Sequence, residues 1–254
     1  MATAAKPKKP SSGGGKSKSN KSPLKRIGKI IAKCIMWFFI LSIFLVVLFR
    51  FVPVYYTPLM FIRVAEQVYD GKPLKMEHKW VPIEKINKNM VNAVVASEDN
   101  LFMEHHGFDF NGIIKAYEHN QHRKKKIHGG STISQQTAKN VFLFPSRTYF
   151  RKGLEAYFTV LIELVWSKER IMEVYLNVIE MGDGIYGIEK ASQTYYDKPA
   201  SKLTKAQAAS ITMCLPNPRK YSPLKNTPFY QSRRDRILET MAQLGDVKLT
   251  KKND

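Results

Sequence analysis

The distribution of apolar residues divides the chain into one uninterrupted hydrophobic stretch near the N-terminus and a long region of periodic hydrophobic positions. The stretch from Cys34 to Phe49 runs for sixteen residues without a charge. Ile30–Ala32 extend it to roughly 20 residues, the length of a membrane-spanning helix. Bulky residues follow Arg50 where a cleavage site would need small ones, so we expect an uncleaved signal anchor over residues 30–50 rather than a cleaved signal peptide.

Beyond the anchor, apolar residues recur mainly at the spacing of amphipathic helices, and alternating strand patterns are scarce. Val54–Ile62 fits either an interfacial aromatic belt or part of the core. Thr132 and Thr204 each precede a Gln by three positions, the spacing of a capping box at a helix start. Ser146 can cap a longer helix with Phe150 on its buried face. The sequence therefore predicts a mainly α globular domain preceded by one N-terminal transmembrane helix. The expected helices cover about residues 82–98, 109–117, 132–139, 146–165, 167–177, 204–215 and 231–244.

The charge of the chain is unevenly distributed. The formal net charge is +20, and residues 1–33 contribute ten Lys and Arg without any Asp or Glu. Residues 1–29 are also rich in Ser, Gly and Pro, so we expect them to form a disordered basic tail in the cytoplasm. Residues 51–254 then form a domain outside the cytoplasm, which argues against a nucleic acid partner. The two cysteines, Cys34 and Cys214, exclude a disulfide scaffold and a cysteine-based zinc module.

Two adjacent carboxylates, Glu98 and Asp99, stand at the end of an apolar helical pattern. A carboxyl group at the end of a buried helix, next to a second carboxylate, has a raised pKa. Such a group is suited to general base catalysis near neutral pH. Taken alone, these residues favour the alternative, an ordinary solvated helix end.

Basic residues gather on the next part of the chain. Arg147, Arg151 and Glu155 are spaced four apart and so share one helix face, with Lys152 beside them. Lys139 lies on the preceding predicted helix. Converging arginines and lysines form an anion site, for which phosphate is the usual ligand. The alternative is a common surface pair between an arginine and a glutamate.

A turn between these groups adds a second possible phosphate contact. Gly129 and Gly130 precede Ser131 and Thr132 at a predicted helix start. Backbone N–H groups at such a start can meet a phosphate. A flexible turn followed by a helix cap is the alternative interpretation.

Taken together, these segments resemble the peptidoglycan glycosyltransferase family, the lysozyme-like domain that polymerises lipid II. The match covers about residues 75–225, and the part from Val178 to Pro218 is similar to the single-domain, monofunctional biosynthetic members. One departure is visible, Ser134, which stands where the family usually has Thr. The four matching motifs, in chain order, are Glu98-Asp99-x-x-Phe102-x-x-His105-x-Gly107, Gly129 to Gln136, Arg151-Lys152-x-x-Glu155, and Lys168-x-x-Ile171-x-Glu173-x-Tyr175-Leu176-Asn177.

The resemblance implies a reaction for these residues. Glu98 would take the proton from the 4-hydroxyl of the acceptor N-acetylglucosamine, whose oxygen attacks the anomeric carbon of the donor N-acetylmuramic acid. Polyprenyl pyrophosphate leaves, and a β-1,4 bond forms with inversion. Lys139, Arg147, Arg151 and Lys152 would stabilise the leaving pyrophosphate. Glu155 corresponds to the second essential carboxylate, which would order the basic cluster or help bind a divalent cation.

The resemblance also implies further contacts and a location. Gln136, Ser131, Thr132 and Asp99 would bind substrate. The family often uses Mg²⁺ or Mn²⁺, although no ligand set in the sequence defines a metal site. The expected partners are lipid II, the nascent glycan chain and membrane lipid, with cell-wall synthesis and division proteins as further candidates. We expect a single-pass protein of the cytoplasmic (inner) membrane with its catalytic domain on the periplasmic side.

Two other functions remain open on these residues. A lysozyme-like fold with two carboxylates could hydrolyse glycan instead of forming it. A membrane scaffold of the wall-building machinery without catalytic activity is the second alternative.

Overall fold

The computed structural model describes residues 23–112, 114, 130–146 and 148–249. The chain divides into two compact units, one ending at Ser42 and one beginning at Ile43. Helix α1 (Pro23–Phe51) runs through the boundary between them. Within it, Arg26–Phe51 is long and apolar enough to cross a membrane. The expected N-terminal apolar helix is therefore confirmed. It begins within the tail predicted over 1–29, of which residues 1–22 lie outside the described part.

The last turns of α1 belong to the second unit and are tied to it by hydrogen bonds. Trp166 donates its indole N–H to the carbonyl oxygen of Val46 over 2.8 Å. The guanidinium of Arg170 donates to the carbonyl oxygens of Phe49, at 2.9 and 3.1 Å, and of Val52, at 2.7 Å. The terminal carbonyl groups of a helix have no partners inside the helix. Here Arg170 provides a partner for one such carbonyl, that of Phe49, while the Val46 carbonyl lies further inside the helix and the Val52 carbonyl follows it.

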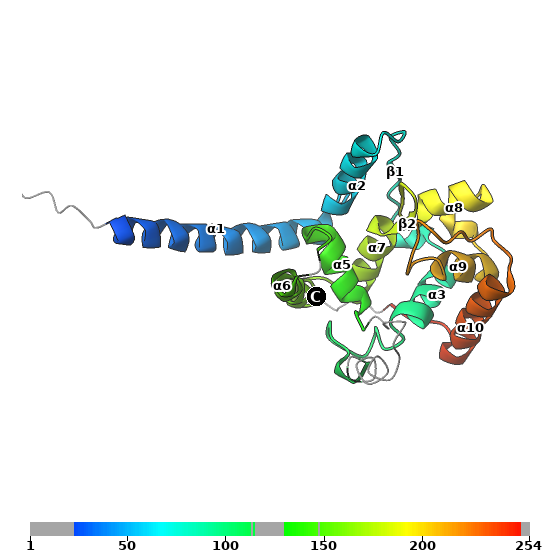
Figure 1. Cartoon of the computed structure of the whole chain (residues 1–254). Coiled ribbons are helices and arrows are strands. Elements are labelled where there is room, and N and C mark those ends of the chain that lie inside the picture. Colours follow the sequence, from blue (N-terminus) through cyan, green and yellow to red (C-terminus); the bar gives the residue numbers. More distant parts are fainter. Residues whose placement is uncertain (1–22, 113, 115–129, 147, 250–254) are drawn as a thin grey trace, which may run out of the picture. The chain divides into compact units, whose positions relative to one another are not determined.

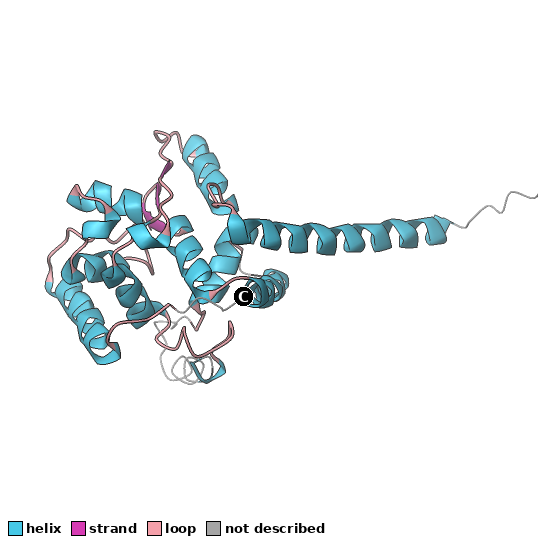
Figure 2. Ribbon diagram, turned by 180° about the vertical axis from the view of Figure 1, so that it is seen from behind, coloured by secondary structure: helices cyan, strands magenta, loops and turns pink. Residues whose placement is uncertain are grey.

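The second unit is mainly helical (Figures 1 and 2), as the sequence predicts. Helices α5, α6 and α7 pack together, α2 lies against α5, and α3 packs against α9 and α10. Large side chains such as Trp166, Tyr175 and Phe102 are fully buried in this core. The helical elements are α2 (Pro58–Tyr69), η1 (Ile83–Lys85), α3 (Lys88–Glu98), α5 (Ile133–Phe142), α6 (Tyr149–Val165), α7 (Lys168–Val178), α8 (Ile188–Tyr196), η2 (Ala200–Lys202), α9 (Lys205–Thr212) and α10 (Pro228–Leu244).

A small sheet lies beside these helices, shown in magenta in Figure 2. Its order is β1 (Glu77–His78), β3 (Ile185–Tyr186), β2 (Glu180–Gly182), with β1 parallel and β2 antiparallel to β3. The turn before β3 requires glycine at Gly184, where φ is +67° and an added Cβ would lie 2.4 Å from a backbone oxygen.

The local signals for helix starts are confirmed in part. Both predicted capping boxes form, one at Thr132 and one at Thr204. The prediction for the next helix is wrong in two details, because Thr148 rather than Ser146 caps α6. The helix therefore begins at Tyr149, and this start leaves Phe150 exposed instead of buried.

Other helix boundaries differ from the prediction by several residues. α3 begins at Lys88, after the separate turn η1, because the side chain of Asn87 caps it. α10 begins earlier than expected, at Pro228. The helix expected over 109–117 falls mostly outside the described residues.

The segment Val54–Ile62 divides between the two interpretations that the sequence allows. Val54 and Met60 are buried in the domain. Tyr55, Tyr56 and Phe61 are exposed. The segment is therefore partly core, and a membrane-interface role for its aromatic residues stays a prediction.

Candidate active site

Glu98 is the last residue of α3, at the end of the buried helix that the sequence predicts. Its side chain remains partly open to a cleft, while the surrounding protein raises the pKa of the carboxyl by burial. The side-chain amide of Gln136 donates to Glu98 Oε2 over 3.0 Å and partly opposes this shift. The result is a carboxylate of raised basicity, held in one orientation.

Gln136 is in turn held by a buried tyrosine. The Tyr175 hydroxyl, from α7, donates to Gln136 Oε1 over 3.5 Å. Burial raises the pKa of Tyr175 well above its usual value, so the phenol stays neutral and remains a donor. Because Gln136 uses its oxygen for Tyr175, its N–H group is left pointing to Glu98. The two hydrogen bonds from Tyr175 to Gln136 and from Gln136 to Glu98 therefore fix the position of the candidate base.

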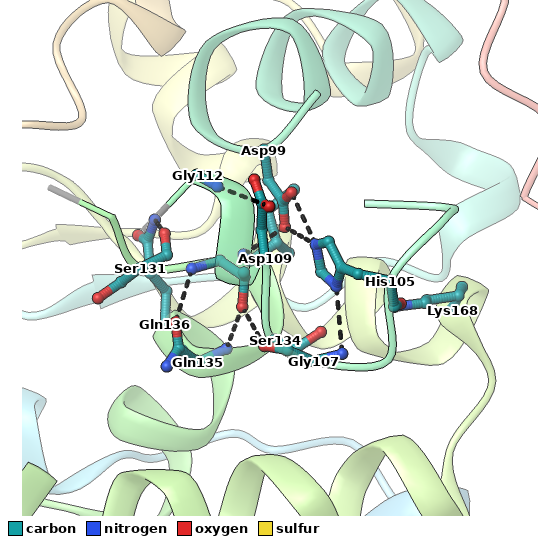
Figure 3. A network of polar contacts seen from close by, with 12 residues as sticks. Asp99, His105, Gly107, Asp109, Gly112, Ser131, Ser134, Gln135, Gln136 and Lys168 are labelled. Atoms are coloured by element: carbon teal, nitrogen blue, oxygen red, sulfur yellow. Dashed lines mark hydrogen bonds and ion pairs between the residues drawn. The ribbon is translucent and has the colours of Figure 1, made fainter. Parts of the chain in front are cut away.

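Asp99 is 7% exposed, and Figure 3 shows its carboxylate next to His105. Its carboxylate accepts hydrogen bonds from His105 Nε2, at 2.8 and 3.0 Å, and from the backbone N–H of Ile133 at 3.0 Å. Ile133 is the first residue of α5, where a negative charge is favourable. These internal bonds favour a positioning role for Asp99 over the substrate contact that the resemblance implies.

His105 and its neighbours fix the loop that follows α3. The Gly107 backbone N–H donates to His105 Nδ1 over 3.1 Å, which places the ring proton on Nε2, toward Asp99. Gly107 itself has a φ of +89°, and an added Cβ would lie 2.8 Å from the Thr159 methyl group. The residues of the first motif thus hold the loop that follows Glu98 in one conformation.

A second polar network joins three helices to the same loop. Lys168 donates to the His105 carbonyl oxygen and to Glu163 Oε1, each over 2.7 Å. The ammonium also lies over the Phe102 ring, 4.6 Å from its centre. Ser134 donates its hydroxyl to the same Glu163 oxygen. The hydroxyl is the group that serine shares with the threonine usual at this position, so the departure keeps this contact.

The basic cluster expected from the third motif is present on α5 and α6. Glu155 is only 2% exposed, and its two oxygens accept from Arg151 and Lys152. Lys152 also donates to the Ser131 hydroxyl over 3.3 Å. Burial lowers the pKa of Lys139, and the negative charge of Glu155 opposes that shift. Three cations thus gather around one carboxylate, while Arg147 lies outside the described residues.

Two cavities are lined by the candidate base and by residues of the basic cluster. The larger, of about 460 Å³, is lined by Gln136, Lys139, Arg151 and Tyr175 among others. The smaller, of about 240 Å³, is lined by Glu98, Asp99, Ser131 and Thr132 among others. Gln136 in the first cavity bonds Glu98 in the second, so the cavities adjoin at the candidate base. The structure therefore brings the described site residues of the sequence prediction into one region.

The Thr132 side chain is committed to structure. Its hydroxyl donates to the Gly107 carbonyl oxygen over 2.7 Å and accepts from the Gln135 backbone N–H as part of the capping box. The Thr132 backbone N–H is also used, since it donates to Gln135 Oε1 over 3.0 Å, and substrate contact by Ser131 or Thr132 stays a prediction.

Two residues of the larger cavity were missed by the sequence analysis, Arg63 of α2 and Glu180 of β2. They are 117 positions apart and belong to no common motif. Nothing in their local spacing indicates that they meet.

A divalent cation does not fit the observed contacts of Glu155. Each of the Glu155 oxygens already accepts a hydrogen bond from a cation, and the positive charges of Arg151 and Lys152 repel a further cation at this carboxylate. Among the residues that the structure describes, no group of three or more His, Cys, Asp or Glu is arranged to hold a metal. We therefore derive no step through a metal ion.

A candidate base beside two adjoining cavities, one of which is lined by Lys139 and Arg151, fits one class of enzyme, the glycosyl-transferring enzymes. A family model described as Transglycosylase matches residues 66–242. The chain belongs to this transglycosylase family, which confirms the resemblance seen in its motifs.

Curated relatives that cover most of the chain carry the name biosynthetic peptidoglycan transglycosylase. A relative of this name from Bacteroides thetaiotaomicron is 49% identical over 86% of this chain and 88% of its own length. One from Bdellovibrio bacteriovorus is 50% identical over 84% and 85%. One from Shewanella oneidensis is 42% identical over 91% and 98%.

Proposed function

We propose that this chain polymerises lipid II into the β-1,4-linked glycan strands of peptidoglycan. The observation that carries the proposal is that Glu98 lines one cavity and is hydrogen-bonded to Gln136, which lines a second cavity together with Lys139 and Arg151. A transferase needs room for an acceptor and a donor and a site for the anionic leaving group. The names of the relatives and the family match support the same reaction.

In the proposed reaction, Glu98 takes the proton of the acceptor 4-hydroxyl. The oxygen attacks the anomeric carbon of the donor from the side opposite its pyrophosphate. As the new C–O bond forms, the bond to the pyrophosphate breaks, and the leaving group keeps that electron pair. The raised pKa of Glu98 suits it to this proton transfer, because a base is most effective when its pKa lies near the working pH.

The leaving group is stabilised by positive charge rather than by a proton donor. Lys139 and Arg151 line the cavity that would receive the pyrophosphate. We propose that Lys152 and Arg147 also stabilise the leaving pyrophosphate. Glu155 holds Arg151 and Lys152 in place and limits their mutual repulsion. This cluster favours a transferase over a glycan hydrolase, which has no pyrophosphate to bind.

The apolar helix α1 fits a substrate that stays in the bilayer. Anchoring the enzyme to the same membrane raises the effective concentration of a polyprenyl-linked substrate. Because basic residues favour the cytoplasmic side, we propose an N-terminus in the cytoplasm and a catalytic domain on the periplasmic side. Partner proteins in wall synthesis or division stay predictions.

The test is lipid II turnover by the full-length protein in detergent, comparing wild type with Glu98→Gln. Loss of a general base lowers the rate about 10²–10⁴-fold. Glu104→Gln is the matched control, since Glu104 is an exposed carboxylate in the following loop. Polymer from wild type and control, but not from Glu98→Gln, supports the proposal. Sugar released from finished glycan would favour a hydrolase, and no reaction with either substrate would favour the scaffold.

A further inference from the structure

One wall of the larger cavity is built by residues that the proposed reaction does not use. Arg63 and Glu180 both line the cavity. Arg63 donates to Glu66 over 2.7 Å, but reaches Glu180 Oε2 only over 3.4 Å. The Glu180 carboxylate is therefore only loosely paired, although its side chain is 8% exposed.

Unpartnered polar atoms gather at this wall. Glu180 Oε1 and the Tyr186 hydroxyl are buried without a hydrogen-bond partner among the described residues, and so is Arg63 Nε. Glu180 pairs directly with Tyr186 between β2 and β3, which places both side chains on one face. Buried polar atoms in folded proteins almost always have partners. At this wall, Glu180 has an unused capacity to accept a hydrogen bond.

The charge at this wall disfavours a phosphate. Arg63 and Arg219 lie among three carboxylates, those of Glu66, Glu180 and Asp183. Acidic groups thus outnumber basic ones here. Burial also raises the pKa of Glu180, as expected for a carboxylate with weak compensation.

The opposite balance holds around Lys139. There Lys139, Arg151 and Lys152 lie around Glu155, and Glu98 is the other carboxylate that acts on Lys139, so cations outnumber carboxylates and an anion is favoured. The cavity therefore has a basic part suited to pyrophosphate and an acidic part suited to uncharged hydrogen-bond donors. Sugar hydroxyl and acetamido N–H groups are donors of this kind.

We propose that Glu180, oriented by Arg63, accepts a hydrogen bond from a hydroxyl or amide N–H of the donor saccharide. The terminal torsion of a glutamate is broad, so the carboxyl can turn either oxygen to the cavity. The contact makes the site selective for a polyprenyl pyrophosphate that carries sugar over one that does not. It rests on the proposed function, since the ligand is the donor of that reaction.

The test compares two ligands on the full-length Glu98→Gln protein, in which turnover is blocked. Lipid II carries phosphate and sugar, while polyprenyl pyrophosphate carries phosphate alone. Adding Glu180→Ala is expected to weaken lipid II binding about tenfold, the loss of one hydrogen bond to a charged group, and to leave polyprenyl pyrophosphate binding unchanged. Lys139→Met is expected to weaken the binding of both lipid II and polyprenyl pyrophosphate.

Asp183→Asn is the matched control. It removes a carboxylate from the same cluster, but Asp183 is 64% exposed on its side chain and does not line the cavity. Both affinities should stay unchanged. If Glu180→Ala does not fold, Glu180→Gln keeps the size and one acceptor oxygen, and a smaller loss confined to lipid II is expected.

The outcomes separate this inference from the proposed function. An equal loss of both ligands in the Glu180 variants would mean that the residue only supports the fold, and would overturn the inference. Unchanged lipid II binding would overturn it as well. In either case, polymerisation by the wild type leaves the proposed function intact. Absence of polymer from the wild type, with neither ligand bound, would overturn both.

Discussion

Replacing Gln136 with Leu removes a hydrogen-bond donor of the Glu98 carboxylate. Among the described residues, Gln136 is the one donor to Glu98 that comes from another helix. The amide donates over 3.0 Å to the ionised form and therefore lowers the pKa of Glu98. A hydrogen bond to a charged group contributes about 1.5–3 kcal/mol. Because Glu98 is partly open to water, which replaces some of this interaction, we expect the lower end. Without this donor the pKa of Glu98 should rise further.

The assay is the pH dependence of kcat/KM for lipid II, whose acid limb reports the ionisation of the free base. The variant's acid limb should move to higher pH, so that activity lost near neutrality returns partly in more alkaline buffer. Tyr175→Phe is the graded comparison. It removes only the weaker 3.5 Å bond that orients Gln136, so its limb should move less and in the same direction.

A lower plateau with an unmoved acid limb would refute this reasoning. Gln136 would then act on the substrate in the cavity that it lines, rather than on Glu98.

Three further predictions concern stability. Glu98→Gln should raise the melting temperature at neutral pH. Burial raises the folded-state pKa of Glu98, so the ionised carboxylate destabilises the fold at pH values above that pKa. The gain should vanish below the ordinary pKa of 4.5, as a pH series of thermal melts would show. Gly107→Ala should cost about 1–3 kcal/mol in urea unfolding, since φ is +89° and the Cβ would meet Thr159; an unchanged midpoint would contradict this. Glu155→Gln should cost about 1–3 kcal/mol and lower turnover, because Arg151 and Lys152 lose their shared acceptor; added salt should restore part of the stability if their repulsion is the cause.

The features that the sequence predicts best are those written in short-range spacing. A capping box places a side chain and its backbone partner within three residues, so the spacing alone is enough to assign Thr132 and Thr204 as helix caps. The position of Glu98 at a helix end follows from the apolar period before it. The shared face of Arg151 and Glu155 follows from a separation of one helical turn.

The features that the sequence does not predict depend on the direction in which a side chain points or on contacts between distant parts of the chain. Spacing does not tell which way a side chain turns, and Asp99 turns inward although its neighbour faces the cleft. Strands of two or three residues are too short to show an alternating pattern, so β1 to β3 left no signal. Arg63 on α2 and Glu180 on β2 are 117 positions apart, and only the tertiary fold brings them together.

The hydrogen bonds at the end of α1 decide where a soluble version of this enzyme should start. A truncation just after Phe51 removes the Val46 acceptor of Trp166 and the Phe49 acceptor of Arg170, which keeps only Val52 of its backbone acceptors. The buried indole N–H and part of the guanidinium are then left without partners. Starting at Ile43 instead keeps these acceptors while discarding most of the apolar helix. The boundary between anchor and enzyme, for the purpose of protein production, therefore lies inside the helix rather than at its end.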